Sequence, residues 1–134
     1  MLPEVQTFWL PKQGNTAEEY EDAFAASVEN RRFGVADGAT ESSFADIWAQ
    51  ALVEAFTQSP PNGIEFDDWL KPLQEAWHKN VSWDRLPWFA EEKAKSGAFA
   101  TLLGLELFPA PPDPPPPPEP PKVGFWGRLF GKSP

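Results

Sequence analysis

The sequence contains no cysteine and a single histidine. Without cysteine the chain has no disulfide framework and no thiol chemistry. This absence fits a reducing compartment, and we expect a cytoplasmic protein. The histidine, His78, falls in a predicted helix away from the acidic motif described below. We therefore expect His78 to be a surface or packing residue without a catalytic role.

Long apolar runs and basic residues are also scarce. No apolar stretch approaches the ~20 residues that span a bilayer, and the N-terminus lacks the basic start and apolar core of a signal peptide. Residues 1–108 hold 8 lysines and arginines against 18 acids, a net charge of −10. This acidic balance argues against a nucleic-acid partner for that part of the chain, and membrane contact is not expected of it.

Proline, by contrast, is abundant and divides the chain. Ten of the 17 prolines lie in residues 109–121. This composition predicts an extended polyproline II rod or a disordered linker after a single folded domain, residues 1–108. The PxxP registers of the linker suit an SH3-like or WW-like partner, and a plain spacer is the alternative. Residues 122–134 form a basic-aromatic tail, which could be a short interfacial or partner-binding helix.

Periodicity within residues 1–108 predicts both strands and helices. Ser42 or Ser43 is the expected N-cap of the first helix, and Pro72 raises the alternative that the second helix begins nearer Lys71. The aromatic stripe of the first helix, with Trp48, should face the core. The predicted fold is α/β, in layers, with a partial antiparallel sheet and two or three helices on one face. The expected strands cover residues 5–10, 21–27, 32–38 and 97–107, and the expected helices cover 44–57, 66–80 and 87–95.

Acidic residues stand at the start of one of these strands and at the end of the next, and together they are called the acidic motif. Glu21 and Asp22 open one strand, and Asp37 and Gly38 close the next, with only residues 28–31 between the strands. If the strands pair as an antiparallel hairpin, the three carboxylates meet at one end of the sheet. Such carboxylates repel one another unless a cation sits among them, and oxygen ligands favour Mg²⁺ or Mn²⁺. The plain alternative for Asp-Gly is a turn.

This order of elements resembles the N-terminal half of the type 2C, metal-dependent serine/threonine protein phosphatases. The resemblance covers roughly residues 5–108 and includes the small-residue-rich strand at residues 97–107. It implies half of an α-β-β-α sandwich, two Mn²⁺ or Mg²⁺ ions, and a phosphoserine or phosphothreonine protein substrate. Asp37 would bridge the ions, Glu21 and Asp22 would ligate or support them, and Gly38 would offer its carbonyl. Lys12 is the only basic residue placed to bind phosphate.

The sequence also departs from the family pattern. The family's later aspartates, from the second half of its domain, are absent, so we expect a truncated form with little activity alone. The alternative is a non-catalytic interaction module that uses the acidic half-domain and the proline-rich and aromatic tail. Because half of a sandwich leaves one sheet face uncovered, we expect Phe24, Val35, Phe99 and Leu103 to be exposed. Self-association or binding of a hydrophobic dye should follow, and should persist when residues 109–134 are deleted.

Overall fold

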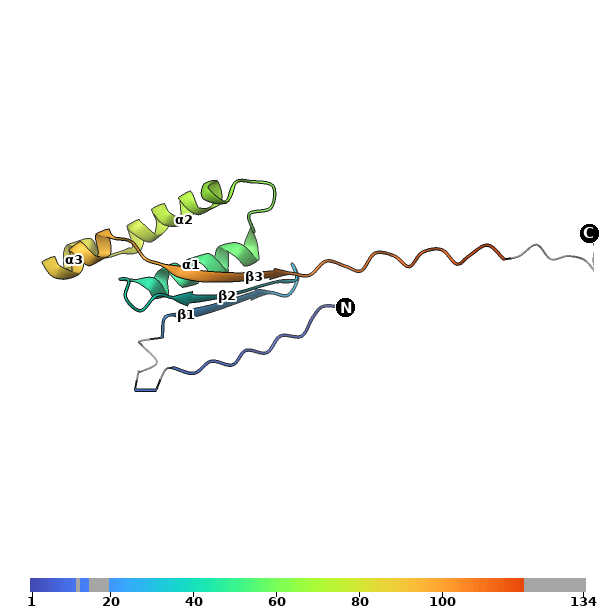
Figure 1. Ribbon diagram of the computed structural model, residues 1–134, viewed down its shortest axis with the longest axis horizontal. Coiled ribbons are helices and arrows are strands. Elements are labelled where there is room, and N and C mark those ends of the chain that lie inside the picture. The colour runs from blue at the N-terminus through green and yellow to red at the C-terminus, as the bar shows by residue number, and fades with distance from the viewer. Residues whose placement is uncertain (12, 15–19, 120–134) are drawn as a thin grey trace, which may run out of the picture.

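The computed structural model describes residues 1–11, 13–14 and 20–119. Its three strands form one antiparallel sheet in the order β1-β2-β3 (Figure 1). The strands are β1 (Asp22–Ser27), β2 (Arg32–Gly38) and β3 (Ala100–Glu106). The helices are α1 (Ala45–Gln58), α2 (Phe66–Asn80) and α3 (Trp88–Lys95), with a short 3-10 turn η2 (Trp83–Arg85) before α3. This arrangement confirms the predicted α/β layers with a partial antiparallel sheet.

Helix α1 lies against one face of the sheet, and α2 stacks on the far side of α1 (Figure 1). Small side chains make this close approach possible on both surfaces. Ala23 and Ala36 of the sheet and Ala49 and Val53 of α1 form one buried cluster. Gly104 of β3 lies directly against the Phe56 ring, where a β-carbon would come within 2.4 Å of it. The small residues on this face of the sheet thus allow α1 to pack closely against it.

A second core lies between α1 and α2 and is rich in tryptophan. Trp48, Leu52, Trp69, Trp77 and Val81 are buried there. The indole N–H groups of Trp69 and Trp77 donate to backbone carbonyls, as buried polar groups require. Trp69 donates to the carbonyl of Ser59 at 2.7 Å, and Trp77 donates to the carbonyl of Phe44 at 3.2 Å. The prediction that Trp48 is a core residue is confirmed, with 9% of its surface exposed.

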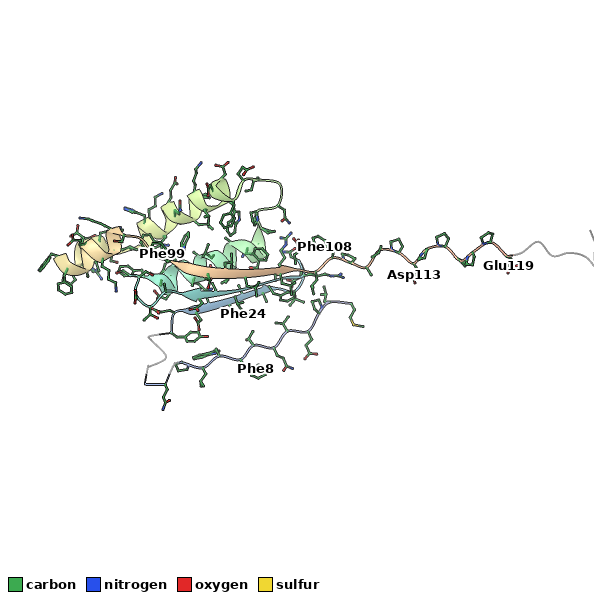
Figure 2. All side chains as sticks on the ribbon, in the orientation of Figure 1. Phe8, Phe24, Phe99, Phe108, Asp113 and Glu119 are labelled. Atoms are coloured by element: carbon green, nitrogen blue, oxygen red, sulfur yellow. The ribbon has the colours of Figure 1, made fainter. Side chains whose placement is uncertain are left out.

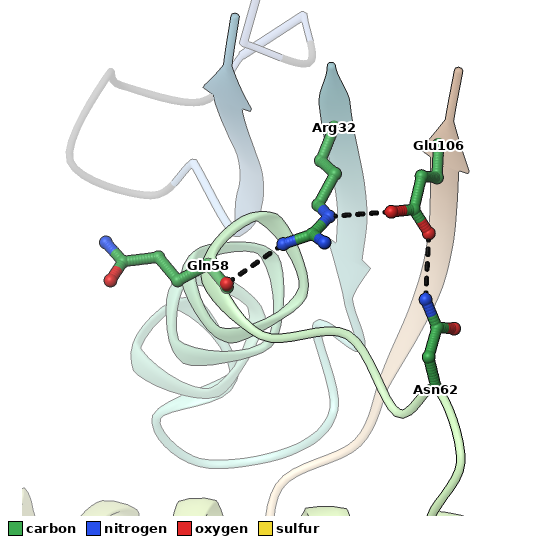
Figure 3. A network of polar contacts seen from close by, with 4 residues as sticks. All are labelled: Arg32, Gln58, Asn62 and Glu106. Atoms are coloured by element: carbon green, nitrogen blue, oxygen red, sulfur yellow. Dashed lines mark hydrogen bonds and ion pairs between the residues drawn. The ribbon is translucent and has the colours of Figure 1, made fainter. Parts of the chain in front are cut away.

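Four polar residues fasten the end of the sheet that lies away from the acidic motif (Figure 3). Arg32 of β2 pairs with Glu106 of β3 at 2.9 Å and also donates to the carbonyl of Gln58, the last residue of α1, at 3.0 Å. Asn62, in the connection to α2, donates to the other oxygen of Glu106 at 2.9 Å. Hydrogen bonds from Asn62 and then from Arg32 hold the pKa of Glu106 below its usual range. The network therefore ties two strands, a helix end and a loop together.

Two local predictions are wrong. Residues 5–10 form no strand, and they pair with no strand of the sheet. Neither Ser42 nor Ser43 caps α1; the N-cap position is Phe44, and Ser42 instead donates to the carbonyl of Ala39 at 2.9 Å. The predicted range of α2 is confirmed, and the alternative start nearer Lys71 is wrong. Pro72 lies inside the helix at an exposed position, so the carbonyl that loses its partner can bond to water.

The other boundaries follow the prediction closely. The hairpin pairs β1 with β2 through a turn at residues 28–31, and β3 and α3 lie within the ranges predicted for them. The predicted pair of Glu91 and Lys95 on α3 is present at 3.1 Å. Residues 107–119 contain neither helix nor strand and extend away from the sheet (Figure 1). No helix within the described ranges has both the length and the apolar character to cross a bilayer.

Candidate functional site

The candidate site lies at the end of the sheet where β1 begins and β2 ends. The strand register sets Asp22 directly opposite Asp37, and Thr101 of β3 pairs with Asp37 on its other side. Residues opposite each other in a ladder share a face of the sheet. Two carboxylates and a hydroxyl therefore form one row across the three strands, on the side away from the helices. The predicted meeting of Asp22 and Asp37 is confirmed.

Glu21 and Gly38 lie at the same end, one position further along. The Gly38 N–H donates to the backbone carbonyl of Glu21 at 3.3 Å. Glu21 directly precedes β1 and is half-buried, whereas Asp22 is exposed. Within residues 1–11, 13–14 and 20–119, no group of three histidine, aspartate or glutamate side chains is close enough to hold a metal ion. That Glu21 is a third ligand stays a prediction.

Gly38 has a steric role that the sequence motif alone does not explain. A β-carbon built on it would lie 2.7 Å from the Glu21 carbonyl oxygen and 3.0 Å from the carbonyl oxygen of Ala45, the first residue of α1. Both contacts are to backbone atoms, so they cannot be relieved by a side-chain rotation. The glycine lets the start of α1 pack on the end of β2, and this packing places Asp37 at the surface of the sheet beside the loop that follows.

Tyr20 was not identified from the sequence and completes one side of the site. Burial raises the pKa of the Tyr20 phenol, and the charge of Asp22, a hydrogen bond to Asp22 and the charge of Asp37 raise it further. The ring of Trp9 lies 5.2 Å from the Tyr20 ring, centre to centre. The position of Tyr20 directly before the acidic pair was the only signal in the sequence. The raised pKa of Tyr20 thus reflects its burial first and the neighbouring carboxylates second.

A cleft of about 740 Å³ opens beside this row of polar residues. The N-terminal segment lines one side of it with Thr7, Phe8 and Trp9, and the sheet face lines the other. The polar end of the cleft is Asp22 and Asp37, and its floor is apolar, formed by side chains of all three strands. Few polar groups at one end of an apolar hollow are typical of a binding site. Lys12, predicted to bind phosphate, lies outside the described residues.

The uncovered face of the sheet, called the open face below, continues from this site. Its apolar side chains are those of Phe24, Phe33, Val35, Leu103 and Leu105. Figure 2 shows Phe24 on the side of the sheet away from the helices. The predicted exposure is confirmed: Phe24 is 38% exposed, Val35 46% and Leu103 71%. Phe99, also predicted on this surface, is 63% exposed but precedes β3 and is not part of the ladder.

The fold is a three-stranded antiparallel sheet with helices on one face only. No family model, curated protein or solved structure matches the chain. The candidate function therefore rests on the geometry of the site and on the motif that its residues form.

Proposed function

We propose that this chain is the metal-binding part of a type 2C-like serine/threonine protein phosphatase domain, with little activity unless a further segment completes it. The observation that carries the proposal is the register of the β1–β2 hairpin, which brings Asp22 opposite Asp37. The acids of the resembled family occupy the same positions in the order of elements. Gly38 supports the proposal because its close packing against α1 fixes the end of β2.

The donor atoms suit a hard divalent cation in kind but are few in number. Carboxylate oxygens are the ligands that Mg²⁺ and Mn²⁺ prefer, and water fills the positions that the protein leaves open. Asp22 and Asp37 would hold such an ion, with Glu21 and the Gly38 carbonyl near enough in sequence to assist. When bound, the ions would neutralise the charge of a phosphate monoester and lower the pKa of a bound water. Two carboxylates predict weak binding.

The first test is a calorimetric titration of Mn²⁺ into the wild-type chain and the Asp37→Asn variant. We expect weak binding by the wild type and a loss of that binding in the variant. Asp46→Asn is the matched control, because Asp46 is exposed in the first turn of α1 and lies outside the candidate site. Equal binding by all three proteins would exclude Asp37 as a ligand.

The second test measures the Mn²⁺-dependent hydrolysis of a phosphothreonine peptide. We expect little or no turnover by the purified chain, because a misplacement of ~1 Å in the reacting groups can cost 10²-fold in rate. Robust hydrolysis that disappears in Asp37→Asn would show that the chain already holds a complete site. It would contradict the view that a further segment is required.

The open face favours a second function, a non-catalytic interaction module. Exposed apolar patches of this kind mark association sites in soluble proteins. In this function the half-domain is a scaffold and the proline-rich segment, residues 109–121, binds an SH3-like or WW-like partner. Titration of an isotopically labelled SH3 or WW domain with the chain tests this. Shifts at the aromatic groove of the labelled domain support it, and their absence with both domain types contradicts it.

A further inference from the structure

The open face has a polarity along its length. Its centre is the cross-strand row of Phe24, Val35 and Leu103. One end of the face carries the carboxylates of Asp22 and Asp37, two residues that lie opposite each other in the β1–β2 ladder. A ligand that matches this face therefore needs apolar side chains and a basic group beside them.

The N-terminal segment leaves room for such a ligand. It borders the cleft of about 740 Å³, yet two of its own apolar side chains point to solvent, with Phe8 90% exposed and Leu10 85% exposed. The segment makes no strand pairing with β1. The apolar floor of the cleft is therefore only partly covered by the described residues.

We propose that residues 122–134 of this same chain dock on the open face. The sequence of this segment contains four large apolar side chains, three basic residues and no acid. Residues 1–108 carry a net charge of −10, so the charges of the two parts are complementary. The apolar side chains would cover the row of Phe24, Val35 and Leu103, and a basic side chain would lie against Asp22 and Asp37. The docking itself requires no metal ion, and a cation held by Asp22 and Asp37 would compete with the basic side chain.

The linker is long enough for the segment to reach its own sheet. The Leu107 N–H donates to the carbonyl of Arg31 at 2.9 Å, so the chain leaves the sheet at the end away from the aspartates. The linker from Leu107 to residue 121 spans roughly 45 Å as polyproline II, whereas the seven-residue strand β3 is roughly 23 Å long. A change of chain direction at the start of the linker, near Leu107, would return the segment to the face.

A short tether also makes the docking favourable. The segment and the face belong to one chain, so a weak contact between them is populated in those linker conformations that let the two meet. Figure 1 shows residues 107–119 extended away from the sheet. The docking is thus an equilibrium in which the open face is covered in part of the molecules and accessible in the rest.

The absence of cysteine gives a direct test on the full chain. A nitroxide spin label is attached to Ser133→Cys, the only thiol of that variant, and methyl signals are compared before and after reduction of the label. We expect the label to weaken the methyl signals of Val35 and Leu103. Leu73 of α2, on the other side of α1, is the internal reference and should keep its intensity.

Two variants and a mixed sample complete the test. Leu103→Lys in the labelled chain should abolish the effect at Val35, whereas Ile64→Lys, at an exposed position between α1 and α2, should preserve it. Circular dichroism checks that both variants are folded. Absence of any effect at Val35 would overturn the proposal. So would an effect of equal size in a mixture of spin-labelled chains with separate isotope-labelled chains, because it would come from a second copy.

Discussion

Substitution of Gly38 by alanine tests how tightly the site is built into the fold. The added β-carbon would lie 2.7 Å from the carbonyl oxygen of Glu21 and 3.0 Å from both the β-carbon and the carbonyl oxygen of Ala45. Backbone atoms on two sides must move to admit it. Overpacking of this kind costs about 1–3 kcal/mol of the free energy of unfolding.

Part of that cost is offset in the unfolded chain. Replacing glycine by alanine reduces the entropy of the unfolded state and returns about 0.4–1 kcal/mol. With the middle of each range, the net loss for Gly38→Ala is about 1.3 kcal/mol. In a domain of this size each kcal/mol lowers Tm by roughly 4–8 °C, so we expect a decrease of roughly 5–10 °C.

Gly34 provides the matched comparison on the same strand. A β-carbon there would lie 3.3 Å from the β-carbon of Val53, a contact that a small shift can relieve. The entropy gain then roughly cancels the strain, and Gly34→Ala should melt within a few degrees of wild type. Thermal unfolding followed by circular dichroism at 222 nm measures all three proteins. Equal melting of Gly38→Ala and wild type would refute the close packing of α1 on the end of β2.

Three further predictions concern ionisation and the open face. Tyr20 is the only tyrosine, so its ultraviolet titration is unambiguous. Its pKa should be raised above the ordinary value of 10.0, because burial and Asp22 favour the neutral phenol. The Asp22→Asn substitution should lower the pKa of Tyr20. An unchanged titration in Asp22→Asn would contradict the contact. Contacts with Asn62 and Arg32 lower the pKa of Glu106 from its ordinary value of 4.5. The free energy of unfolding that these contacts contribute is therefore present above pH 4.5 and is lost as the pH falls through the lowered pKa. Glu106→Gln should therefore flatten the dependence of Tm on pH below about 4.5, and a dependence as steep as that of wild type would assign it to other carboxylates. Leu103→Lys should reduce the fluorescence of bound ANS, whereas Ile64→Lys should change it less, because only Leu103 belongs to the continuous open face. An equal reduction in both variants would show that the dye does not report this face.

The sequence was informative wherever a local pattern decides the structure. The short connection at residues 28–31 forces an antiparallel hairpin, and the hairpin then sets Asp22 opposite Asp37. The helical period around Trp48 predicted the buried side of α1. Half of the candidate site was therefore predictable, because its two aspartates lie within one hairpin.

Features that depend on distant partners were not predictable in the same way. Residues 5–10 have the composition of a strand, but composition does not determine whether a segment pairs with a neighbouring strand. The contact of Arg32 with Glu106 depends on the register between β2 and β3, which are separated by three helices in the sequence. The contact of Tyr20 with Asp22 depends on the side-chain geometry just before β1, which the sequence does not specify.

The central claim is that Asp22 and Asp37 form part of a metal site, and paramagnetic broadening by Mn²⁺ tests it most directly. Substoichiometric Mn²⁺ is added to the ¹⁵N-labelled chain and the loss of each amide signal is recorded. Broadening should begin at Asp22, Asp37 and Thr101, the three residues that share one row of the sheet. Broadening that begins instead at the exposed acids Asp67 and Asp68 of α2, or spreads evenly over the acidic surface, would contradict the claim.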